Sequence, residues 1–173
     1  MASMRELKGR IGSVNSSQKI TGAMKMISSA KLRKVQSALE HLMPFRNQLQ
    51  NTINNLLGAD SEYQSPLTEQ RPVHRVAFVV FGSDEGLCGA FNVSLFKFLL
   101  EAMNRTNDEL GTKTEYIVYP VGKKILSSVF KMKDVEIADV SYLNSKSGAD
   151  AVKRLTDELT NRFLSHEIDR VEL

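Results

Sequence analysis

The chain has 173 residues, of which 25% are charged and 42% hydrophobic, a composition that excludes a disordered or collagen-like chain. Its longest apolar run covers residues 76–81, far short of the roughly 20 residues that a membrane-spanning helix needs. A single cysteine, Cys88, excludes a disulfide framework and a cysteine zinc cluster.

Charge divides the chain into two parts. Residues 1–57 hold nine lysines and arginines and two acids, a net charge of +7, whereas the other 116 residues hold 14 basic and 18 acidic groups, a net charge of −4. Residues 58–72 contain Gly, Pro, Ser and Asp and show no helical period. We therefore predict a basic segment over 1–57, a linker over 58–72 and a second domain over 73–173.

The basic segment is predicted to form one long helix. Its apolar residues recur at steps of three and four, which gives the narrow stripe typical of a coiled-coil seam. Such a helix spans roughly 80 Å at about 1.5 Å per residue. A compact domain of this size has a radius of gyration of only about 13 Å. We therefore expect the helix to protrude and to need a partner helix. The stripe consists of Met4, Leu7, Ile11, Val14, Met24, Ile27, Leu32, Val35, Leu39, Leu42, Phe45, Leu49, Ile53 and Leu56.

Several residues weaken this helix. Gly9, Gly12 and Gly22 each cost about 1 kcal/mol relative to alanine. Pro44 removes one backbone hydrogen bond and is expected to kink the helix. The alternative is a helical hairpin that breaks at Gly22 or Pro44.

The second domain alternates strand and helix patterns. Four apolar or alternating runs predict strands, and three amphipathic segments predict helices. This order predicts a three-layer, Rossmann-like α/β domain with an open sheet and right-handed crossovers. The chain stops inside the last strand, so we expect a fragment of a longer protein. The strands are predicted at 73–81, 116–121, 135–138 and 168–173, and the helices at 91–104, 122–130 and 149–165.

The connection between the first strand and the next helix contains three glycines, Gly82, Gly86 and Gly89. Glycines at this place are found in phosphate-binding loops. Their spacing is neither GxGxxG nor that of a P-loop, and Asp84 and Glu85 put negative charge where phosphate would sit. We favour a tight turn with positive φ at one or more glycines. A nucleotide-dependent α/β enzyme is kept as an alternative.

Cys88 lies in the same loop and would be a nucleophile if a helix N-terminus lowered the pKa of its thiol. The sequence places no base beside it, so we expect a partly buried structural thiol. The three histidines lack metal-ligand spacing. No carboxylate pair or Ser/His/Asp set is apparent. We therefore expect no catalytic residue, metal or cofactor.

Two stretches resemble a known family. Residues 11–36 read IGSVNSSQKITGAMKMISSAKLRKVQ and closely resemble the N-terminal helix of the gamma subunit of F-type ATP synthase. Residues 83–92 read SDEGLCGAFN and are similar to that family's SDRGLCGxxN segment. The sequence departs from the family at Gly22, where Lys is common, and at Glu85, where Arg is usual.

The resemblance implies a rotor-stalk subunit that performs no chemistry itself. In the family, a two-helix rod lies in the bore of a ring of three alpha and three beta subunits, and an α/β base lies against the epsilon subunit and the membrane c-ring. Proton or sodium flow turns the rod and drives ATP synthesis at the beta subunits. Family members continue past residue 173 and finish with a second long helix, antiparallel to the first. The resemblance implies a peripheral location on the cytoplasmic face of an inner membrane, and because no leader is apparent we expect a bacterial protein.

The resemblance also implies two contact surfaces. On the rod, basic residues and their neighbours are expected to meet acidic loops of the beta subunits, and either Met24 or Met26 is expected to pack on the second helix. The loop is expected to face the lower ends of the beta subunits or the rod base. The rod residues are Gln18, Lys19, Thr21, Met24, Lys25, Met26, Lys31, Arg33 and Lys34. The loop residues are Asp84, Glu85, Gly86, Leu87, Cys88, Gly89 and Asn92.

The basic helix has a further interpretation as a nucleic-acid-binding segment. Against this, Phe45 is the only aromatic residue of the segment 1–57, and the seam pattern calls for a helix as partner. Because the stripe is long and apolar, we also expect the isolated chain to cover it, either by self-association or by a bent helix.

Overall fold

The computed structural model describes residues 3–58, 65–111 and 114–173. Two compact units, Met1–Tyr63 and Gln64–Leu173, make up the chain. Part of the predicted linker, residues 59–64, lies outside the described residues. In its described part, Gly58 ends the first helix, and Pro66–Thr68 form a short 3-10 helix, η1.

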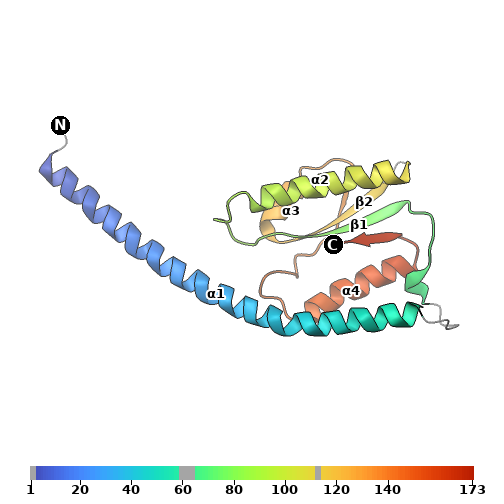
Figure 1. Cartoon of the computed structure of the whole chain (residues 1–173). Coiled ribbons are helices and arrows are strands. Elements are labelled where there is room, and N and C mark those ends of the chain that lie inside the picture. The colour runs from blue at the N-terminus through green and yellow to red at the C-terminus, as the bar shows by residue number, and fades with distance from the viewer. Residues whose placement is uncertain (1–2, 59–64, 112–113) are drawn as a thin grey trace. The chain divides into compact units, whose positions relative to one another are not determined.

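The first unit is a single helix, α1 (Met4–Gly58), which is 55 residues long and curves along its length (Figure 1). It runs without interruption through Gly22 and Pro44, so the helical hairpin is wrong. Pro44 removes only one backbone hydrogen bond, and the remaining backbone hydrogen bonds keep the helix continuous at this position. No residue of α1 is buried, and the stripe side chains are between 47% and 84% exposed.

The second unit is built on a parallel sheet of four strands in the order β3-β2-β1-β4. The strands are β1 (Arg75–Phe81), β2 (Glu115–Val121), β3 (Glu136–Ile137) and β4 (Arg170–Glu172). Val76 pairs with Tyr116 on one side and with Arg170 on the other. Five consecutive residues of β1, 76–80, are buried because both faces of this central strand are covered.

Helices cover both faces of the sheet (Figure 1). On one face, α2 (Phe91–Leu110) and α3 (Lys123–Val129) bury Leu99, Met103 and Ile125 against β1 and β2. On the other face, α4 (Ala149–Leu164) buries Leu155 with Ile117. The predicted three-layer, Rossmann-like α/β fold is confirmed.

Helix α2 is longer than its sequence pattern predicts. It continues beyond Asn104 to Leu110 through mostly polar residues. Thr106 is buried within this extension, so tertiary packing overrides weak local propensity there. The helix ends where Gly111 adopts a left-handed conformation, with φ of 60°, and donates its amide to the Asn107 carbonyl oxygen.

Two glycines allow the carboxyl ends of β1 and β2 to approach closely. The Gly82 amide donates to the Val121 carbonyl oxygen at 2.8 Å. Gly122 has φ of 118°, and a Cβ added there would lie 2.7 Å from the Gly82 oxygen. A Cβ on Gly82 would lie 2.6 Å from Cβ of Ile125. Side chains are therefore excluded at both positions.

We expect Gly122→Ala to destabilise the second unit by roughly 2–4 kcal/mol, because it adds backbone strain and a steric overlap. Urea unfolding followed by the near-ultraviolet signal of Tyr116, Tyr119 and Tyr142 would measure the loss. Gly148→Ala is the matched control, since its Cβ would meet no atom within 4 Å. Equal unfolding midpoints for the two variants would contradict this account of Gly122.

Candidate interaction surface

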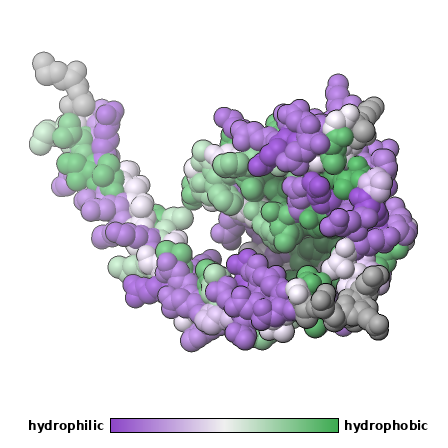
Figure 2. All heavy atoms as spheres, turned by 45° about the vertical axis from the view of Figure 1, so that its right-hand side comes forward, coloured by the Kyte–Doolittle hydropathy of each residue, from purple (hydrophilic) through white to green (hydrophobic). Residues whose placement is uncertain are grey.

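The rod residues predicted from the sequence are all exposed on α1. The Thr21 hydroxyl donates to the Ser17 carbonyl oxygen at 2.8 Å, within the same helix. Within the described ranges, no carboxylate forms an ion pair with the basic members Lys19, Lys25, Lys31, Arg33 and Lys34. In Figure 2, hydrophobic side chains interrupt the hydrophilic surface of α1.

The five cations do not share one face of the helix. Successive residues of an α-helix are rotated by about 100°, so Lys19, Lys25 and Lys31 point in three well-separated directions. Arg33 and Lys34 fill two further directions. The cations therefore form a collar around α1, which we call the basic collar. A collar suits a partner that surrounds the helix better than one that covers a single side.

The seam changes character within the basic collar. Counted in sevens from Met4 and Leu7, its positions fall on polar residues for two heptads. Met24 and Ile27 each lie one residue before a seam position, and thus about 100° away from it around the helix. The single stripe that the sequence spacing predicts is therefore interrupted here, and a strict heptad count would have found the change. The polar seam residues are Gln18, Thr21, Lys25 and Ser28.

The β1–α2 loop is held in place by Asn92, in the first turn of α2. The Asn92 amide oxygen accepts from the Ser83 backbone N–H at 3.0 Å, and its amide nitrogen donates to Ser83 Oγ at 2.8 Å. The same nitrogen lies 3.1 Å from Cys88 Sγ. Cys88 is exposed, so the expected partly buried thiol is wrong. Its sulfur is tied to the loop's own polar groups rather than packed in the core.

Asp84 also stabilises the fold of the second unit through hydrogen bonds. One carboxylate oxygen accepts from the Ser145 amide at 2.7 Å, and the other accepts from the Lys123 amide at 3.3 Å. The hydrogen bond from Ser145 is the main cause of the lowered pKa of the Asp84 carboxyl. Asp84 and Asn92 are therefore half-buried connectors, whereas the other predicted contact residues of the loop are exposed.

Leu87 is the most unusual exposed residue of this loop. Its side chain is 95% exposed, and its φ is 63°, a left-handed value that a leucine rarely adopts. Gly89 has φ of 59°, which confirms the predicted tight turn with a positive-φ glycine. The turn thus presents an apolar side chain to solvent at the tip of the loop.

The β1–α2 loop lies where an open parallel sheet can bind a ligand, but its chemistry does not favour a nucleotide. In open parallel sheets, ligands bind at the carboxyl ends of the strands, where the strand order reverses. Here the reversal lies between β1 and β4, at the carboxyl end of β1 from which this loop starts. The hollow of about 780 Å³ in the second unit lies by the carboxyl ends of β2 and β3, and Asp84 and Glu85 of the loop line it with negative charge that would repel a phosphate. Side chains already engage the amides of Ser83 and Lys123.

Among residues 3–58, 65–111 and 114–173, no group of three or more His, Cys, Asp or Glu side chains could hold a metal ion. No helix in this described part of the chain combines the length and apolar character that crossing a bilayer requires.

Comparison with known proteins defines the class. The family model described as ATP synthase matches residues 3–173. Over its whole length the chain is 42% identical to an ATP synthase gamma chain of Phocaeicola vulgatus and 43% identical to one of Bacteroides fragilis, and it covers 59% of each. It is 37% identical to the chloroplastic ATP synthase gamma chain 1 of Arabidopsis thaliana, over 99% of this chain and 46% of that one. The chain belongs to the ATP synthase gamma chain family and spans less than two thirds of these relatives.

We expect Asp84→Ala to speed hydrogen exchange of the Ser145 amide by roughly tenfold, because that amide loses a charge-assisted hydrogen bond. Amide exchange followed by NMR would measure the change. Glu85→Ala removes the same charge from the neighbouring exposed residue and should leave the Ser145 amide unchanged. Equal acceleration in both variants would show that charge, not the bond, protects the amide.

Proposed function

We propose that this chain supplies the N-terminal part of the central rotor stalk of an F-type ATP synthase. In this role it transmits rotation, driven by proton or sodium flow, to the catalytic beta subunits. Family membership supports the proposal, and the main observation behind it is the structure of α1. A helix of 55 residues without one buried side chain cannot draw its stability from its own unit. Its stripe calls for a second helix, and its length of about 80 Å suits a shaft.

The basic collar supports placement of the shaft inside a ring. Cations that point in all directions around a helix fit a bore with acidic groups on its wall, such as a ring of three alpha and three beta subunits. Each exposed ion pair contributes only about 0–1 kcal/mol. Many weak contacts allow a turning shaft to exchange one partner for the next without a large barrier.

The β1–α2 loop supplies a second contact surface in this proposal. Leu87 and Glu85 are exposed there, whereas Asp84 and Asn92 hold the loop to its own unit. A loop anchored at both ends presents its tip with little loss of conformational entropy on binding. We assign this tip to a contact with the beta subunits or with the base of the shaft.

The α/β unit would then be the base of the stalk, with the epsilon subunit and the c-ring as further partners. We propose no chemistry and no cofactor for the chain itself, because the catalytic sites of the complex belong to the beta subunits. The corresponding location is peripheral, on the cytoplasmic face of a bacterial inner membrane. The relatives give no support to the nucleic-acid alternative.

A binding experiment tests the role of the basic collar. The complete gamma chain that contains this sequence is expected to co-purify with alpha and beta subunits and to affect their ATP hydrolysis. Changing Lys19, Lys25 and Lys31 together to glutamine should weaken binding to the ring by about tenfold at low salt, and the difference should shrink at 0.5 M salt.

The matched control changes three exposed lysines of the α/β unit, Lys97, Lys131 and Lys153, to glutamine. It alters net charge equally and should bind like the wild type. Failure of the unaltered chain to join the ring would contradict the proposed function. Equal weakening in both triple variants would contradict only the basic collar. Steeply salt-dependent DNA binding would instead favour the nucleic-acid alternative.

We also expect the 173-residue chain alone to self-associate, because the stripe has no cover within α1. Sedimentation should show an average mass that rises with concentration. Leu42→Glu with Leu49→Glu should shift the chain to monomer. Gln48→Glu with Asn55→Asp adds the same charge away from the stripe and should not. A monomer at all concentrations would contradict this prediction.

A further inference from the structure

Arg71 lies between η1 and β1 and is almost buried, with its side chain 11% exposed. Its Nε donates to Asp169 Oδ1 at 2.9 Å. One terminal nitrogen donates to the carbonyl oxygens of Phe163 and Ile168, at 2.8 Å and 2.5 Å. The other lies 2.6 Å from His166 Nδ1, and the guanidinium stacks 4.3 Å above the Phe163 ring. We call these five residues the Arg71 clasp.

Asp169 extends the clasp to the start of β1. Its second carboxylate oxygen accepts from the backbone amides of His74 and Arg75, at 2.9 Å and 3.0 Å. Burial opposes ionisation of Asp169, but these two amides and the charge of Arg71 together lower the pKa of its carboxyl. One carboxylate therefore holds both Arg71 and the first residues of the central strand.

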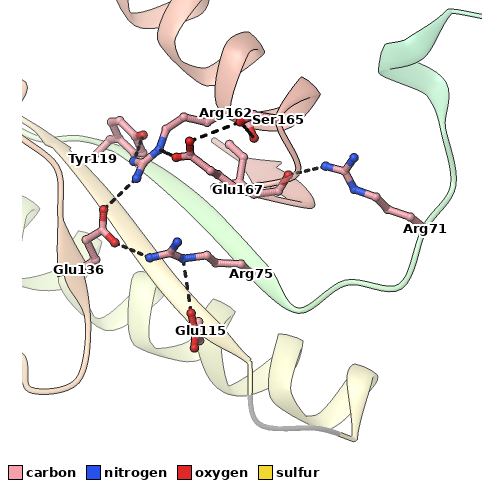
Figure 3. A network of polar contacts seen from close by, with 9 residues as sticks. Arg71, Arg75, Glu115, Tyr119, Glu136, Arg162, Ser165 and Glu167 are labelled. Carbon is pink, nitrogen blue, oxygen red and sulfur yellow. Dashed lines mark hydrogen bonds and ion pairs between the residues drawn. The ribbon is translucent and has the colours of Figure 1, made fainter.

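A second ionic network lies at the same, amino-terminal edge of the sheet (Figure 3). Arg162, near the end of α4, donates to the Tyr119 hydroxyl at 2.7 Å, to Glu167 at 2.9 Å and to Glu136 at 3.0 Å. Glu136 also pairs with Arg75. The end of α4 is thus joined to β1, β2 and β3. The Arg71 clasp therefore binds to an end of α4 that is itself fixed to the sheet.

The chain reaches the α/β unit at this edge. Among the described residues, the hydrogen bonds that join residues 65–73 to the rest of the unit are all made by Arg71. Apart from them, η1 packs on α4, and Val73 packs against the core. Arg71 is also only 13 residues beyond Gly58, the last residue of α1.

We propose that Arg71 is a positioning residue that fixes the segment leaving α1 to the α/β unit, so that rotation passes between helix and unit instead of being lost in their connection. This inference rests on the proposed rotor function. The planar fork of an arginine is required, because one side chain serves two carbonyls, a carboxylate and an aromatic face. Lysine would keep the charge opposite Asp169 and lose most of the rest.

The test uses assembled ATP synthase in sealed vesicles, with substitutions in the complete gamma chain. Arg71→Ala should keep ATP hydrolysis within about twofold and lower the ions pumped per ATP by at least half, with Arg71→Lys in between. Arg170→Ala is the matched control, because Arg170 is 37% exposed and makes longer ion pairs with Glu109 and Glu172. It should pump like the wild type.

Hydrogen exchange of the chain alone separates release of the segment from general unfolding. In Arg71→Ala, the amides of Leu67 and Thr68, which donate to Ser65 within this segment, should exchange at least tenfold faster, while those of β2 stay unchanged. Acceleration of both would overturn the proposal, as would an assembled Arg71→Ala enzyme with the wild-type pumping ratio. If this variant fails to assemble, faster exchange confined to the Leu67 and Thr68 amides supports the anchor, and unchanged exchange of these amides overturns it. Failure of the unaltered chain to assemble would count against the rotor function instead.

Discussion

The apolar stripe of α1 is the constraint on which the rest depends. Burying an aliphatic side chain of this kind is worth about 1.5–3 kcal/mol, and the stripe has many such side chains, none of them buried. A lone helix gains little from its own hydrogen bonds in water. The stability of α1 must therefore come from a partner that buries the stripe. The surfaces of α1 outside the stripe, chiefly the basic collar, remain available to other partners.

The two edges of the sheet have different roles in the α/β unit. At the carboxyl edge, Gly82 and Gly122 bring backbones together, and the loop beyond them exposes Leu87. At the amino edge, Arg71 and Arg162 cross-link the start of the strands to the end of α4. A parallel sheet produces this division by itself, because all strands begin at one edge and end at the other.

Local sequence patterns were sufficient to predict most of the fold. The apolar run of β1 and the repeating steps of α1 depend on neighbours in sequence, so both were predictable. The extension of α2 beyond Asn104 and the exposure of Cys88 depend on tertiary surroundings, and the sequence pattern misjudged both. The contact residues of α1 stay a prediction. The Arg71 clasp was not predictable, since Arg71 and Asp169 are 98 residues apart and each resembles an ordinary surface charge.

Charge is used in opposite ways in the two units. The cations of the basic collar are exposed and unpaired within the described residues, so a partner can be exchanged at a cost of about 1 kcal/mol for each contact. Arg71 is nearly buried, and breaking such a pair costs about 3–5 kcal/mol because a charge is left without a partner. The proposed rotor role requires both: weak contacts where the shaft slides past its neighbours, and strong, directional ones where its own parts must move together.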